Sequence, residues 1–285
     1  MTAAPTYENL LTELSDGVLT VTMNRPDKLN AFNPPLQNDM ISMFTDANTN
    51  DAVRAIVVTG AGRGFCAGAD ISAGAEGFAV WGRQDAKGGA RPSITKSIHD
   101  CRKPVIAAIN GIAVGVGITM CLPMDIRMMS SAAKIGFIFN RRGMVMEAGS
   151  SWFLPRLVGM QQAQEWVASG EIFGPDEALK GGLVRSIHAP EDLVPAAQAL
   201  ARKFATGTSA ITMALNRQLM WKMAGAQDAA DALAIDMECI KYMAASADVA
   251  EGIAAFREKR AANFPMKAST DLPPLYPWWE KKSAS

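Results

Sequence analysis

The sequence predicts an α/β fold, because stretches with the side-chain spacing of strands alternate with stretches that have the spacing of helices. Residues Val18 to Met23 alternate apolar and polar side chains, as a half-buried strand does. Three later runs, 55–59, 105–109 and 126–129, are mostly apolar without alternation, which is typical of strands covered on both faces. These patterns favour repeated units of strands and helices.

Helices are expected in both halves of the chain. After Pro34 and Pro35, helical spacing predicts an amphipathic helix with an apolar face formed by Leu36, Met40, Met43, Phe44 and Ala47. From about residue 195 the chain is rich in Ala and Met and shows no clear strand. We therefore expect a core of residues 1–195 and a helical region of residues 196–285.

Two local signals subdivide the helical region. Asp248 followed by Glu251 has the pattern of a helix N-cap with its capping box, so a helix is expected to begin there. The three prolines between Asp271 and Trp279 exclude a regular helix in the tail.

Composition limits the classes of partner. The chain has 28 basic and 28 acidic side chains, so no long-range field favours a nucleic acid or an anionic membrane. The four cysteines show neither C-x-x-C pairing nor zinc spacing to a histidine. We expect free buried thiols and no metal site from Cys66, Cys101, Cys121 and Cys239.

One apolar segment, Pro104 to Met124, is about long enough to cross a bilayer. Asn110, glycines and prolines interrupt it, so we expect a buried strand, turn and helix instead. The first eleven residues lack the charged and then apolar design of a signal peptide. A cytoplasmic, soluble protein without a membrane partner is the resulting expectation.

Two glycine-rich segments indicate where chemistry takes place. Residues 63–70 and 108–117 each run from an apolar strand into small side chains, where the backbone can approach a ligand closely. Residues 115–117 are expected to open a helix that continues to Leu122, whose dipole would add positive potential. The two segments predict a pair of backbone N–H donors for an oxyanion, such as a thioester enolate.

The accompanying acid or base is expected to be a carboxylate. The only histidines, His99 and His188, form no Ser-His-Asp or Cys-His pattern, and His99 is expected to be structural. Enolate chemistry therefore fits the residues better than an acyl-enzyme mechanism.

Three segments in this order resemble the crotonase family, the enoyl-CoA hydratase/isomerase superfamily: Phe65–Asp70, Lys103–Gly111 and Glu251–Arg260. The resemblance extends from about Val18 to Phe264. It implies a spiral of ββα units, a C-terminal helical region for trimerisation, and a homotrimer or a dimer of trimers. It also implies an acyl-CoA substrate, so that coenzyme A enters with the substrate and no separate cofactor is required.

The resemblance gives each glycine-rich segment a role. The amides of Ala69, which follows Gly68, and of Val116, between Gly115 and Gly117, would form an oxyanion hole.

Contacts to coenzyme A are implied at both ends of the chain. The region of Ala67 would touch the adenine, and Lys28 would contact the nucleotide or its phosphates. Phe264 and Lys267 would make such contacts from a neighbouring subunit.

The stretch from Ser72 to Pro92 is rich in Gly and Ala, and we expect a mobile loop in the position of a substrate lid. Phe78 and Trp81 within it would influence the depth of the acyl pocket.

The chain departs from the hydratases of this family, which use two glutamates. Aligned without gaps, those positions hold Thr119 and Phe139, which cannot ionise and which we place among the substrate-binding residues. Glu147, followed by small residues and Ser150-Ser151, resembles the single catalytic glutamate of Δ3,Δ2-enoyl-CoA isomerases. It would remove a proton at C2 while the amides hold the enolate, and return it at C4.

Alternatives remain for the protein and for single residues. Glu147 could act alone on a bound water, which would make the protein an enoyl-CoA hydratase, or the chain could bind acyl-CoA without catalysis. Glu147 could also merely cap the helix expected near Ser150. Asp70 is expected to anchor its loop by accepting backbone N–H bonds.

Overall fold

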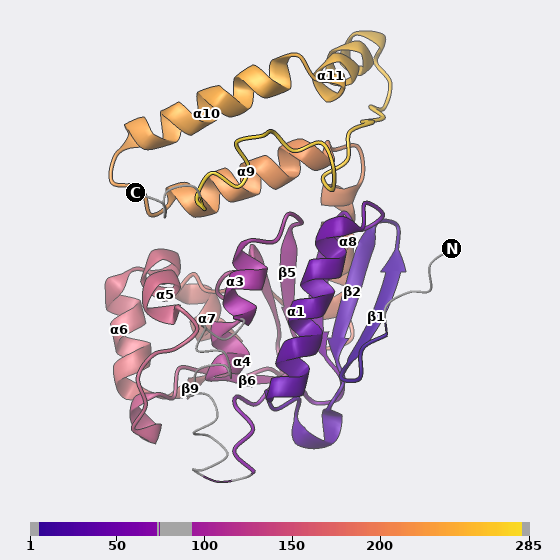
Figure 1. Cartoon of the computed structure of the whole chain (residues 1–285). Coiled ribbons are helices and arrows are strands. Elements are labelled where there is room, and N and C mark those ends of the chain that lie inside the picture. Colours follow the sequence, from indigo (N-terminus) through magenta and orange to yellow (C-terminus); the bar gives the residue numbers. More distant parts are fainter. Residues whose placement is uncertain (1–5, 73, 75–92, 281–285) are drawn as a thin grey trace, which may run out of the picture.

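A computed structural model describes residues 6–72, 74 and 93–280 and confirms the α/β prediction (Figure 1). Its larger sheet has six strands in the order β1-β2-β3-β5-β7-β10. Only the β1–β2 pair is antiparallel among neighbours of this sheet. The strand bounds are Leu10–Ser15, Val18–Met23, Ala55–Gly60, Val105–Ile109, Ile126–Ser130 and Ser186–His188.

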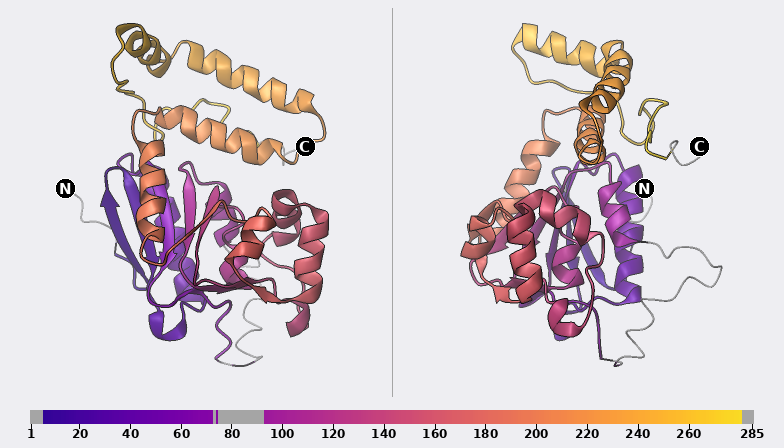
Figure 2. Two further views of the ribbon diagram at one scale, coloured as in Figure 1. Left: turned by 180° about the vertical axis from the view of Figure 1, so that it is seen from behind. Right: turned by 90° about the vertical axis from the view of Figure 1, so that its left-hand side faces the viewer.

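Helices cover both faces of this sheet, as the apolar strands require (Figures 1 and 2). On one face, Ile56 and Val58 of β3 share a core with helix α1 (Pro34–Thr49) and with α3 (Ile94–His99). On the other face, Ala55 and Val57 pack with α8. This alternation along one strand shows why the run has no polar positions.

Helix α8 (Leu193–Ala205) contains the boundary that we expected at residue 195. Its buried side chains Leu193, Ala197 and Ala201 lie against the sheet, so the helix packs with the sheet core. Helices α9 (Ala210–Met223), α10 (Ala229–Ala244) and α11 (Ala247–Glu258) lie beyond it, above the edge of the sheet in Figure 1.

Arg217 of α9 connects the C-terminal helices to the core. Its guanidinium is 3% exposed and pairs with Asp125 at 2.8 Å. It also donates to the backbone carbonyls of Ile98, His99 and Cys101, at the end of α3. A buried charge is stable only with such partners, so this arginine fixes where α9 rests on the core.

The expected start of α11 is wrong. Ser246 is the N-cap, and its side chain accepts a hydrogen bond from the Val249 N–H. Asp248 is buried in the first turn, where it accepts bonds from the Ser209 hydroxyl and the Met266 N–H. Glu251 pairs with Arg260. Both acids thus bind partners elsewhere in the fold and do not form the expected capping box. The C-terminal tail is irregular, as expected.

A smaller sheet holds the glycine-rich segments. Its order is β4-β6-β8-β9, with bounds Gly64–Cys66, Ile112–Val114, Ile135–Gly136 and Ile172–Phe173. Strand β6 runs directly into α4 (Val116–Thr119), which ends three residues before the expected Leu122. The chain then continues in turns toward Pro123, because the residue before a proline disfavours helical backbone.

The two glycine-rich segments touch at Gly117. A Cβ atom on Gly117 would lie 2.0 Å from the carbonyl oxygen of Cys66, so no larger residue fits without moving the backbone. The expected free, buried state of the four cysteines is confirmed.

Three further helices complete the part of the chain that contains the smaller sheet: α5 (Ser150–Val158), α6 (Met160–Ser169) and α7 (Pro175–Lys180). Within the described ranges, no helix is long and apolar enough to cross a membrane.

We predict that Gly117→Ala lowers the free energy of unfolding by about 3 kcal/mol, because the added methyl group forces the two segments apart. Gly174→Ala is the control, since a Cβ atom there meets no described atom within 4 Å, and it is expected to cost less than about 1 kcal/mol. Urea unfolding of both variants provides the measurement. Equal costs would show that the contact at Gly117 tolerates a side chain.

Candidate active site

The chain after β4 presents a backbone N–H at Ala69. Ala69 forms a parallel bridge with Phe32, in which the Phe32 N–H donates to Gly68 (2.7 Å) and the Asp70 N–H donates to Phe32 (2.8 Å). Successive amides of an extended chain point to opposite edges. The Ala69 N–H therefore points away from Phe32, and it has no acceptor among the described residues.

A second N–H lies at Val116, the first residue of α4. The first amides of a helix have no partner within the helix, and the Val116 N–H finds none elsewhere in the described part of the chain. The carbonyl of Gly115, the preceding residue, accepts hydrogen bonds from the N–H groups of Ile118 and Thr119. Because α4 follows β6 directly and β6 pairs with β4, the segments that carry the two amides are neighbours.

The carboxylate of Glu147 is hydrogen-bonded to a residue of α4. Its Oε1 accepts a hydrogen bond of 2.5 Å from the hydroxyl of Thr119, which is fully buried one helical turn after Val116. The Glu147 side chain therefore does not cap α5, whose N-cap is Gly149 without a side-chain bond. Thus one short helix carries a free amide at its first residue and holds the carboxylate at its fourth.

The backbone after Glu147 explains the direction of its side chain. Ala148 has a left-handed conformation (φ 52°), which an L-residue adopts only at an energetic cost. The Thr95 hydroxyl holds the Ala148 carbonyl at 3.1 Å, and the Glu147 carbonyl accepts from the Ser150 N–H and hydroxyl. Glu147 therefore uses its backbone to start α5 and leaves its carboxylate for Thr119.

Burial raises the pKa of the Glu147 carboxyl, and the hydrogen bond from Thr119 partly opposes this increase. Burial also raises the pKa of the Cys66 thiol to about 12, and the negative charge of Glu147 adds to that rise. The carboxylate is thus close enough to β4 for its charge to act there. Its second oxygen, Oε2, accepts no hydrogen bond from the residues that the structure describes.

The anchoring expected for Asp70 is confirmed. One oxygen of its carboxylate accepts from the Ser72 hydroxyl (2.6 Å) and from the Ser72 N–H (3.2 Å). The other pairs with Arg25 at 3.0 Å. The bonds from Ser72 and Arg25 hold the pKa of Asp70 below its ordinary value. Arg25 was not identified from the sequence.

The predicted coenzyme A contacts remain predictions. Ala67 is half-buried and donates its N–H to Leu29 at 3.0 Å, next to the exposed Lys28 of η1 (Pro26–Lys28). Phe264 and Lys267 lie beyond the end of α11, and their expected contact from a neighbouring subunit stays a prediction.

Phe139 is 4% exposed and belongs to the apolar core, where it precedes η3 (Asn140–Arg142). Its substrate-binding role stays a prediction. The expected lid, with Phe78 and Trp81, falls largely outside the described residues.

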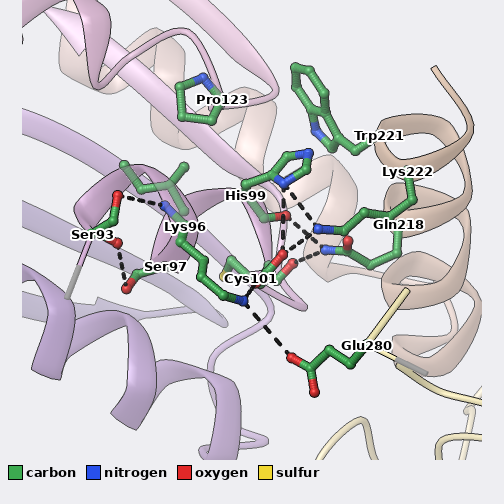
Figure 3. A network of polar contacts seen from close by, with 12 residues as sticks. Ser93, Lys96, Ser97, His99, Cys101, Pro123, Gln218, Trp221, Lys222 and Glu280 are labelled. Carbon is green, nitrogen blue, oxygen red and sulfur yellow. Dashed lines mark hydrogen bonds and ion pairs between the residues drawn. The ribbon is translucent and has the colours of Figure 1, made fainter. Parts of the chain in front are cut away.

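His99 belongs to a separate polar network between α3 and α9 (Figure 3). Its Nδ1 lies 3.0 Å from the Lys222 ammonium, and both Lys222 and Lys96 pair with Asp100. Burial, followed by the charge of Lys222, lowers the His99 pKa to about 4. The ring is therefore neutral near pH 7 and structural, as expected. In the ranges that the structure covers, no group of three or more potential metal ligands is found.

Comparisons with known proteins identify related sequences and structures. A family model described as enoyl-CoA hydratase/isomerase matches residues 13–267. Enoyl-CoA hydratase AFT3-1 of Alternaria alternata is 37% identical over 252 residues, which cover 88% of this chain and 83% of that protein. The 1,2-epoxyphenylacetyl-CoA isomerase of Escherichia coli (strain K12) is 30% identical over 272 residues, covering 90% and 98%.

Among solved structures, a probable enoyl-CoA hydratase/isomerase from Mycobacterium abscessus matches with a TM-score of 0.81 and 32% identity. The match covers 90% of this chain and 99% of that chain.

We predict that Glu147→Gln stabilises the protein more at high pH than at low pH. Because the folded pKa of Glu147 is raised above its ordinary value of 4.5, the folded state holds this proton more tightly than the unfolded state. Wild-type stability therefore falls as pH rises from 4.5 through the folded pKa. Glu147→Gln lacks this loss of stability, so its stability relative to wild type increases over the same pH range.

Denaturant unfolding from about pH 4 to about pH 8 measures the difference. Glu165→Gln, at an exposed position of α6, is the control for replacing a carboxylate by an amide. A flat difference for Glu147→Gln would contradict a buried carboxylate with a raised pKa.

Proposed function

Because this chain belongs to the crotonase superfamily of enoyl-CoA hydratases and isomerases, we propose that it shifts the double bond of an enoyl-CoA thioester. In this proposal Glu147 is the single acid and base. The amides of Ala69 and Val116 form the oxyanion hole.

The proposed reaction has two proton transfers. The Glu147 carboxylate removes a proton from C2 of a 3-enoyl-CoA, and the electron pair moves onto the thioester oxygen as an enolate. The amides of Ala69 and Val116 donate hydrogen bonds to that oxygen; one such donor contributes about 2.7–4 kcal/mol in other enzymes. The carboxylic acid then returns the proton to C4, which leaves the double bond between C2 and C3.

The observation that supports this mechanism is the environment of the Glu147 carboxylate. Thr119 holds Oε1, whereas Oε2 has no partner among the described side chains and can take the substrate proton. Burial raises the pKa, which makes the carboxylate a stronger base than an exposed glutamate. One base that serves both transfers needs no second acid, in keeping with the non-ionisable Thr119 and Phe139 at the positions of the hydratase glutamates.

Hydration is the second candidate, favoured by the name of the Alternaria alternata relative. Water would add to a 2-enoyl-CoA, with Glu147 acting alone on the water. The products separate the two reactions, because only hydration yields a 3-hydroxyacyl-CoA. Tight acyl-CoA binding without turnover of either substrate would identify a binding protein instead.

The proposal includes the assembly. If Phe264 and Lys267 contact coenzyme A, they reach it from a neighbouring subunit, which requires a homotrimer or a dimer of trimers. Coenzyme A is supplied by the substrate, and the mechanism uses no other cofactor.

We predict that Glu147→Gln lowers the rate of 3-enoyl-CoA isomerisation by roughly 10²–10⁴-fold, because the amide can neither take nor return a proton. Glu165→Gln is expected to leave the rate nearly unchanged. Chromatographic analysis of isomer and 3-hydroxyacyl product gives both readouts. Isomerisation that survives in Glu147→Gln would exclude Glu147 as the base.

We predict that Val116→Pro lowers kcat by about 10²–10³-fold, because proline lacks the N–H that would hold the enolate oxygen. Proline is well tolerated at the first position of a helix, which limits the structural cost. Val116→Ala keeps the N–H and serves as the control. Similar kcat values for the two variants would show that this amide does not contact the substrate.

A further inference from the structure

Arg25 joins the two chain segments that orient the amide of Ala69. One arm of its guanidinium (Nη1) donates to the carbonyl of Ala31, and the other (Nη2) binds the Asp70 carboxylate at 3.0 Å. Ala31 directly precedes Phe32, and Asp70 directly follows Ala69. Arg25 thus spans the Phe32–Ala69 bridge from both of its strands.

The backbone of Arg25 is itself held by hydrogen bonds. Its N–H donates to Asn30 Oδ1 at 2.8 Å, and its carbonyl accepts the Asn30 N–H at 2.9 Å. Asn30 is fully buried and donates to the carbonyls of Ala61 and Gly64, at the start of β4. The guanidinium therefore extends from a rigid turn that is tied to the same strand it helps to orient.

The ion pair is partly buried. The Arg25 and Asp70 side chains are 18% and 16% exposed, and Ser72 occupies the other oxygen of Asp70. A partly buried pair with several charge-assisted bonds holds its geometry better than an exposed pair. Lysine could not replace Arg25, because a single ammonium cannot span two acceptors in the fork geometry of a guanidinium.

We propose that Arg25, acting through Asp70 and Ala31, positions the Ala69 N–H for the enolate oxygen. This inference rests on the proposed function. Arg25 is a positioning residue, since both arms bind protein groups. Its influence is expected on kcat rather than on KM, because a donor displaced by about 1 Å can cost roughly 100-fold in rate while the coenzyme A contacts stay in place.

Arg25→Lys and Asp70→Asn are expected to lower kcat about 10–100-fold and to change KM by less than about threefold. The double variant is expected to lose little more than either single variant, because both remove one interaction. Lys241→Arg, in the exposed pair with Glu238 on α10, is the control and is expected to leave both constants unchanged. Unchanged kcat in Arg25→Lys and Asp70→Asn would overturn the inference.

A binding measurement separates this inference from the proposed function. Acetoacetyl-CoA ionises to an enolate with a near-ultraviolet band, and an oxyanion hole lowers the pH at which the bound probe ionises. In Arg25→Lys and Asp70→Asn this pH is expected to return toward that of the free probe. Should either variant not fold, Ser72→Ala removes one donor to Asp70 and is expected to shift the same readout by a smaller amount.

Three outcomes are decisive. A shifted ionisation in the variants supports the positioning role. Ionisation as in wild type, with the probe bound, overturns the positioning role and leaves the proposed function standing. Failure of the wild-type protein to bind or ionise the probe overturns the proposed function, and the inference with it.

Discussion

The contact between Gly117 and the Cys66 carbonyl is the constraint on which the site depends. It brings two strand ends, some fifty residues apart in the chain, close enough that only a hydrogen atom fits between them. Both candidate oxyanion donors, at Ala69 and Val116, are main-chain amides within three residues of this contact. Their separation is therefore set by backbone packing rather than by side-chain rotamers, which suits a preorganised electrostatic site.

Helix α4 couples the donor and the base. Val116 opens the helix with a free amide, and Thr119, one turn later, holds the Glu147 carboxylate. Both groups therefore depend on the same helical turn. On the opposite side of the Ala69 strand, the bonds of Arg25 and Asp70 restrict the other amide. The candidate site thus lies between α4 and the bonds that Arg25 and Asp70 make.

The strands were predictable because burial on both faces leaves a local signature: the run 105–109 is confirmed without a shift in either boundary. The hydrogen bond between Glu147 and Thr119 could not be predicted from the sequence. Its partners lie 28 residues apart and meet only after α4 and the loop that follows it are packed. The predicted start of α11 was wrong for a similar reason. Asp248 has the local chemistry of a cap, but Ser209 and Met266, both distant in sequence, occupy its carboxylate.

The buried thiol of Cys66 has a consequence for the durability of such a catalyst. The conjugated thioester that the proposed reaction forms is an electrophile, and a nearby thiolate would add to its C3 atom. Cys66 is fully buried, and burial raises the pKa of its thiol to about 12, so the sulfur stays protonated. Burial of this thiol, with a small addition from the Glu147 charge, thus protects it from alkylation by the product of the proposed reaction.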